Sequence, residues 1–140
     1  VNAVMSQALD MGINYFDTAN SYGIGKSEEA LGMSLKGRRV GIHGLGRIGL
    51  EIAARLEAFK VEIHYFSRRE RDDVPYAYHD SLVGLAAAVD IMISIVPSTP
   101  QTNGAINAAV LEALGSNGVL INVGRGSQLN IAQQTILLLC

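Results

Sequence analysis

Cysteine, charged residues and long hydrophobic runs are all scarce in this sequence of 140 residues. Its one cysteine, Cys140, excludes an intramolecular disulfide framework and a thiolate metal cluster. Charged residues make up 17% of the chain, below the usual share of about 25%, whereas apolar residues make up 49%. We therefore expect a globular chain that buries whole elements and has room for one domain, or one domain and a fragment.

The sequence lacks the features of a membrane-spanning helix, a nucleic-acid-binding surface and a signal peptide. The longest apolar stretch, residues 85–96, is interrupted by Asp90 and falls short of the roughly 18 residues of a membrane helix. Eleven basic against thirteen acidic residues give no basic surface for nucleic acid. The first ten residues lack the basic start and apolar core of a signal peptide. We therefore expect a cytoplasmic protein that binds neither membrane nor nucleic acid.

Strand-like and helical patterns alternate along the chain. Strands are expected at residues 39–43, 61–66, 91–96 and 118–123, and the apolar runs of the last two are typical of strands buried on both faces. Helices are expected from Ile48, Leu82 and Ile106, and a short connecting strand around residues 76–79. The first of these helices has an apolar stripe at Ile48, Ile52, Leu56 and Phe59. The alternation predicts an α/β fold, a doubly wound parallel sheet of the Rossmann type, with an extra βα unit at the N-terminus. Residues 131–140 fit a helix or a strand.

The strand at residues 39–43 leads directly into a glycine-rich motif, G-x-G-x-x-G, formed by Gly44, Leu45, Gly46, Arg47, Ile48 and Gly49. In a strand–turn–helix setting, the first glycine permits a tight turn and the second lets the backbone approach a pyrophosphate. The third lets the helix pack close to the strand, and the helix N-terminus offers free N–H groups to the phosphates. The alternative is an ordinary turn with a surplus of glycine.

The end of the second strand bears on the choice of cofactor. A carboxylate at this point would hold the ribose 2′-hydroxyl of NAD, but Ser67, Arg68 and Arg69 stand there instead. A hydroxyl with two guanidinium groups suits a 2′-phosphate, which favours NADP(H) and leaves NAD(H) as the alternative. In the other interpretation this is a solvated loop in which Arg69, Glu70 and Arg71 pair among themselves.

Residues 37–130 resemble the NAD(P)-binding domain of the D-isomer-specific 2-hydroxyacid dehydrogenases, in the branch of the hydroxypyruvate/glyoxylate reductases. The matching stretches are RRVGIHGLGRIGLEIAARLEAF, IHYFSRR, DIMISIVPSTPQT and INAAVLEALGSNGVLINVGRGSQLN. The resemblance implies that Val96, Pro97 and Thr102 border the adenosine and nicotinamide-ribose path. It also implies that Val123 and Gly124 lie near the nicotinamide and that Arg125 is the catalytic arginine that binds a 2-keto acid.

The sequence also departs from that family. The acid–base histidine and its glutamate partner would lie downstream of residue 140, and the substrate domain has no counterpart here, so we expect an oxidoreductase domain that is not catalytically complete alone. Gln128, Leu129 and Asn130 stand where members commonly carry a hydrophobic pair and an aspartate. The alternative functions are a non-catalytic or designed dinucleotide-binding scaffold and an aldo-keto reductase remnant.

The N-terminal part resembles a different family. Residues 1–38 are similar to an early barrel segment of the aldo-keto reductases, in which Asp17 and Tyr22 match two catalytic positions. The lysine and histidine that complete that site belong to later barrel strands, so we expect Asp17 to cap a turn and Tyr22 to be packed or exposed. This resemblance divides the chain into residues 1–38 and 39–140 and implies a chimera.

The three histidines lack the spacing of metal ligands. His43 lies just before the glycine motif, where a ring that is buried or at the edge of the cofactor is expected. We expect no metal, and a homodimer as the oligomeric form to test.

Overall fold

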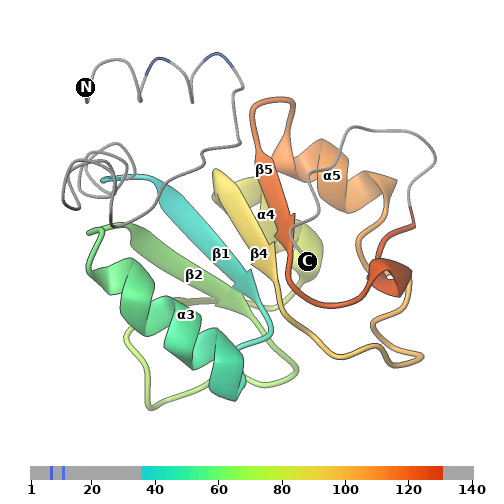
Figure 1. Ribbon diagram of the computed structural model, residues 1–140, viewed down its shortest axis with the longest axis horizontal. Coiled ribbons are helices and arrows are strands. Elements are labelled where there is room, and N and C mark those ends of the chain that lie inside the picture. Colours follow the sequence, from blue (N-terminus) through green and yellow to red (C-terminus); the bar gives the residue numbers. More distant parts are fainter. Residues whose placement is uncertain (1–6, 8–10, 12–35, 131–140) are drawn as a thin grey trace, which may run out of the picture.

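The computed structural model describes Gln7, Met11 and residues 36–130. Residues 36–130 form a β-sheet with its helices (Figure 1). The predicted N-terminal βα unit, the aldo-keto-like positions Asp17 and Tyr22, and residues 131–140 lie outside the described residues. The elements follow in the order β1 (Arg39–His43), α3 (Arg47–Glu57), β2 (Glu62–Phe66), β3 (Ala77–His79), α4 (Leu82–Ala88), β4 (Ile91–Ser94), α5 (Ala108–Leu114), β5 (Val119–Asn122) and the 3-10 turn η1 (Gly126–Gln128).

The sheet within these residues has five parallel strands in the order β3-β2-β1-β4-β5. The chain runs outward from β1 to β3 and then returns to place β4 on the other side of β1. The strand order therefore reverses between β1 and β4, where His43 pairs with Phe66 on one side and with Ser94 on the other. Open α/β sheets bind ligands at such a reversal, outside the carboxyl ends of the strands. The predicted doubly wound parallel sheet is confirmed.

Helices cover both faces of this sheet. Its strands therefore carry apolar side chains toward both faces. On one face Ile42, Ile63 and Tyr65 pack with Leu45 and Ala53, beneath α3. On the other face α4 and α5 enclose a second cluster, which comprises Leu82, Leu85, Ala86, Val89, Met92, Ile106, Val110, Leu114 and Leu120. Figure 1 shows α3 on the near side of the sheet and α4 behind it.

Two details differ from the sequence prediction. The strand expected at residues 91–96 ends at Ser94, because the ladder stops after Ile95 donates to the His43 carbonyl, and Pro97 has no N–H to continue it. The predicted apolar stripe of α3 is also partly wrong, since Ile48 is 61% and Phe59 37% exposed. Gly49 and Ala53 form the buried line instead, because Gly49 must lie against the Gly44 carbonyl.

None of the helices within residues 36–130 has the length and hydropathy that crossing a lipid bilayer requires.

Candidate cofactor-binding site

The three glycines of the motif occupy the turn from β1 into α3, and each has a different physical role. Gly44 has φ +103°, and a Cβ there would lie 2.7 Å from Val96 Cγ1. A Cβ on Gly49 would lie 2.2 Å from the Gly44 carbonyl oxygen. A Cβ on Gly46, in contrast, would meet nothing within 4 Å. The fold therefore needs Gly44 and Gly49, whereas the open space at Gly46 has no structural use within the described residues.

The N-terminus of α3 is available to an anion. Gly46 is the N-cap residue and no side chain caps the helix. The first turn contains no acidic residue that would compete for its N–H groups. Unpaired N–H groups and the positive end of the helix dipole attract phosphate. The open face at Gly46 and the uncapped helix thus coincide where the sequence predicts a pyrophosphate.

The loop after β2 carries the predicted 2′-phosphate residues at the same edge of the sheet. The Ser67 hydroxyl donates to the Arg69 carbonyl oxygen at 2.6 Å and so shapes the turn. Arg68 and Arg69 are exposed, and neither forms an ion pair within residues 36–130. Two guanidinium groups on the loop after β2 therefore have no carboxylate partner among residues 36–130.

Arg71 has a different role from these two arginines. It forms a two-point ion pair with Asp73, with Nε–Oδ1 3.0 Å and Nη2–Oδ2 2.6 Å, and does not pair with Glu70. This hydrogen bonding lowers the pKa of the Asp73 carboxyl. Arg71 Nη1 also donates to the Leu45 carbonyl at 3.3 Å, which ties the loop to the glycine motif. The suggested pairing among Arg69, Glu70 and Arg71 is thus replaced by the Arg71–Asp73 pair.

The loop after β4 contains the predicted residues Val96, Pro97 and Thr102. The Thr102 hydroxyl donates to the Pro97 carbonyl and accepts from the Thr99 N–H at 2.9 Å. These bonds close the loop into a compact turn. Thr102 therefore shapes the wall at the edge of the site with its hydroxyl already engaged.

The turn after β5 presents Val123, Gly124 and Arg125. The buried Asn122 amide accepts from the Gly124 N–H at 3.0 Å and donates to the Arg125 carbonyl at 3.1 Å. Val123 is 45% exposed and Arg125 is exposed. An exposed arginine and an exposed apolar side chain thus adjoin on a turn that Asn122 holds.

Four buried polar side chains lie beneath these loops, and only the first of them was considered for the site from the sequence: His43, Ser94, Asn122 and Gln128. Burial lowers the pKa of His43 from its ordinary 6.5 to about 4, so the ring is neutral at pH 7. The one sequence signal was Gln128, a polar residue at a position that is commonly hydrophobic. Of the two alternatives for His43, a buried ring or a ring at the edge of the cofactor, burial is confirmed.

The other two histidines lie away from this site. His64 Nδ1 and His79 Nε2 are 2.9 Å apart at the β2–β3 edge, and His64 also contacts Glu62. No group of three or more side chains with metal-binding geometry occurs among the described residues.

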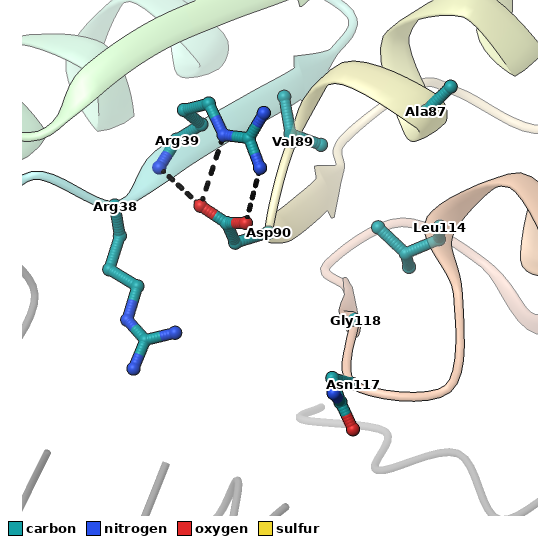
Figure 2. A pocket seen from close by; sticks show the side chains of 8 residues that line it. All are labelled: Arg38, Arg39, Ala87, Val89, Asp90, Leu114, Asn117 and Gly118. Atoms are coloured by element: carbon teal, nitrogen blue, oxygen red, sulfur yellow. Dashed lines mark hydrogen bonds and ion pairs between the residues drawn. The ribbon is translucent and has the colours of Figure 1, made fainter. Parts of the chain in front are cut away.

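A cavity of about 500 Å³ opens at the opposite edge of the sheet, at the amino ends of β1 and β4 (Figure 2). Arg39 Nη2 contacts Asp90 Oδ1 at 2.7 Å there, and the Arg39 N–H donates to the same carboxylate. This pairing lowers the pKa of Asp90. Arg39 and Asp90 therefore neutralise each other as an ion pair. None of the predicted cofactor residues lines the cavity.

The sheet reversal, the glycine turn and the uncapped α3 together define a dinucleotide-binding domain of the Rossmann type. A family model described as D-isomer specific 2-hydroxyacid dehydrogenase, NAD binding domain, matches residues 4–134. The chain belongs to this family.

Named relatives agree with this assignment. The chain is 53% identical over 90 residues to hydroxyphenylpyruvate reductase of Plectranthus scutellarioides, covering 64% of this chain and 29% of that protein. It is 46% identical over 101 residues to a glyoxylate/hydroxypyruvate reductase of Arabidopsis thaliana, covering 72% of this chain and 32% of that protein.

Solved structures agree as well. The crystal structure of the NADPH-dependent glyoxylate/hydroxypyruvate reductase of Sinorhizobium meliloti, in complex with NADP and malonate, is 47% identical with a TM-score of 0.67. That match covers 91% of this chain and 38% of the solved chain. The sequence therefore spans about a third of the length of the relatives it matches.

Proposed function

We propose that this chain is the NADP(H)-binding domain of an oxidoreductase that reduces a small 2-keto acid of the glyoxylate or hydroxypyruvate type. The observation that carries the proposal is the open space at Gly46 over the uncapped N-terminus of α3. Two of the relatives are glyoxylate/hydroxypyruvate reductases and one of these is NADPH-dependent, which supports the substrate class and the cofactor.

The residues present fit such a cofactor. The motif from Gly44 to Gly49 would hold the pyrophosphate, and Ser67, Arg68 and Arg69 would hold the 2′-phosphate. Further along the site, Val96, Pro97 and Thr102 would border the adenosine and nicotinamide-ribose path, and Val123 and Gly124 would border the nicotinamide. Bound NADPH supplies the hydride. Arg125 would bind the carboxylate of the keto acid, because a guanidinium group matches it with two parallel hydrogen bonds.

The cofactor preference tests the role of the loop after β2. Calorimetric titration is expected to give an affinity for NADPH about 10- to 100-fold above that for NADH, because charge-assisted hydrogen bonds to the 2′-phosphate are absent in NADH. The preference should shrink with added salt, since Arg68 and Arg69 face solvent. The double variant Ser67→Asp, Arg68→Ala should shift the preference toward NADH.

Arg55→Ala is the matched control, because it removes an exposed arginine that pairs with Glu51 on α3. It should leave both affinities unchanged. Equal wild-type affinities for NADH and NADPH would contradict the assignment of the 2′-phosphate residues.

The substrate side of the proposal is tested at Arg125. In the chain saturated with NADP, Arg125→Ala is expected to weaken glyoxylate or hydroxypyruvate binding about 10-fold, the loss of a charge-assisted contact, and to leave NADPH affinity unchanged. Titration of each ligand measures this, with Arg55→Ala again as control. An unchanged keto acid affinity would remove Arg125 from the site.

These 140 residues by themselves are expected to show no appreciable turnover. The alkoxide that forms on hydride transfer needs a proton, and a positioned general acid contributes about 10²–10⁴-fold. His43 is neutral at pH 7 and buried, while His64 and His79 contact each other at the β2–β3 edge. A glyoxylate reduction assay measures turnover; rates on the order of 1–10³ s⁻¹ would show that another group completes the site.

Other sequence interpretations stay predictions. The aldo-keto resemblance of residues 1–38, with the chimeric origin and domain boundary it implies, has to be weighed against a family model that begins at residue 4 and runs through that segment. A homodimer and a cytoplasmic location likewise stay predictions.

A further inference from the structure

A directed series of hydrogen bonds runs through the buried polar residues beneath the site. Ser94 Oγ donates to Gln128 Oε1 at 3.4 Å. Because a hydroxyl has one proton, Ser94 must then accept from His43 Nδ1, which lies 3.1 Å away. At the other end, Gln128 Nε2 donates to the Val96 carbonyl oxygen. The series therefore starts at the carboxyl end of β1 and ends on the backbone that follows β4.

The same amide also meets the turn after β5. A Cβ on Gly124 would lie 2.6 Å from both Gln128 Nε2 and Gln128 Oε1, and 2.8 Å from the Val96 carbonyl. The Gly124 backbone is thus pressed against the amide and against Val96 together. Gln128 itself is fully buried, and its backbone carbonyl accepts from the Ile106 N–H at 3.0 Å. One side chain consequently contacts the segment at Val96, which would border the adenosine and nicotinamide-ribose path, and the turn at Gly124, which would border the nicotinamide.

The sheet alone does not hold these two segments. The ladder bonds nearest to them are Ile95 N–H to the His43 carbonyl and Val123 N–H to the Ser94 carbonyl. Val96 lies one residue beyond the first of these bonds and Gly124 one residue beyond the second. Leaving a buried amide without partners is costly, so its hydrogen bond favours one placement of the Val96 carbonyl, and the Gly124 backbone packs against the same amide.

We propose that Gln128 is a positioning residue for the nicotinamide half of the dinucleotide, acting through the Val96 carbonyl and the Gly124 turn, with Ser94 and His43 orienting its amide. The proposal rests on the proposed function and adds a residue that selects how the nicotinamide end is held. The glycine motif and the Ser67–Arg69 loop form no hydrogen bond with the Gln128 side chain among the described residues. The residues that would hold the pyrophosphate and the 2′-phosphate are therefore not bonded directly to this amide.

The test compares two ligands on the full chain: NADPH, and 2′,5′-ADP, which has the adenosine half with its 2′-phosphate and lacks the nicotinamide. Gln128→Met keeps a side chain of similar length but removes the hydrogen bonds. It is expected to weaken NADPH binding about 5- to 10-fold in calorimetric titration, and to leave 2′,5′-ADP affinity within about 2-fold. The exposed Gln101, changed to Met, is the matched control and should alter neither affinity.

Ser94→Ala is a second, smaller change that keeps the proposal testable if Gln128→Met fails to fold. It should produce the same selective loss for NADPH at about 2- to 5-fold, because the amide keeps one partner. An equal loss for both ligands would show a general structural role and overturn the proposal, as would unchanged NADPH binding in a folded variant. Failure of the wild-type chain to bind either ligand would instead overturn the proposed function, and this inference with it.

Discussion

Replacing Gly46 by valine is expected to abolish NADPH binding while the thermal unfolding midpoint stays within about 2 °C of the wild type. A Cβ at this position meets nothing within 4 Å, and the backbone at Gly46, with φ −84° and ψ −162°, is accessible to any residue. The fold therefore accepts a side chain there. The same side chain should block the pyrophosphate, because it would occupy the space through which phosphate reaches the N–H groups of α3. A loss of at least about 100-fold in affinity should follow, as when several charge-assisted hydrogen bonds are lost together.

Gly49→Ala is the matched control, because it adds a smaller group to the same motif. This variant should lower the stability of the fold, whereas Gly46→Val should lower the affinity for NADPH. Its Cβ would lie 2.2 Å from the Gly44 carbonyl oxygen, so the helix must shift. Overpacking of this kind costs about 1–3 kcal/mol of folding free energy. Thermal unfolding and calorimetric titration of both variants separate the two roles. Normal NADPH binding by Gly46→Val would remove the glycine motif from the cofactor site.

The free energy of unfolding is expected to fall by about 3 kcal/mol between pH 7.5 and pH 4 through His43 alone. Burial lowers the pKa of this ring from 6.5 to about 4 in the folded chain. As the pH falls below 6.5, the His43 ring binds a proton in the unfolded chain but stays neutral in the folded chain. The stabilisation is therefore complete above the unfolded pKa and is lost as the pH falls toward the folded one.

His43→Leu isolates this contribution, because leucine fills a buried site without titrating. Urea unfolding at a series of pH values should give a difference between wild type and variant that changes by about 3 kcal/mol over this range. His79→Gln is the control: that ring is only half-buried, so its removal should change the pH dependence much less. Parallel pH profiles for wild type and His43→Leu would contradict the buried, neutral state of the ring.

Much of the fold could be predicted because its signals are local. The apolar run of β2 was expected at residues 61–66 and occurs at Glu62–Phe66, and the helix expected from Leu82 is α4. The glycine motif was recognisable because its spacing follows from a backbone turn within a few residues. The bounds of β4 were less accurate, because the strand ends where a partner strand stops accepting hydrogen bonds. The sequence places Ile48 in the apolar stripe of α3, but this residue lies in the first turn of the helix and is exposed.

The sequence by itself determined the alternation of strand and helix, the site of the glycine turn and the family to which residues 37–130 are similar. These properties depend on residues close together in the chain. Only the tertiary structure decided that Gly46 faces open space while Gly49 is packed, and that Gln128 contacts Val96, 32 residues away. Such contacts arise when β4 pairs with β1 and β5 pairs with β4. A buried amide then finds its hydrogen-bond partners among backbone groups whose positions no local pattern encodes.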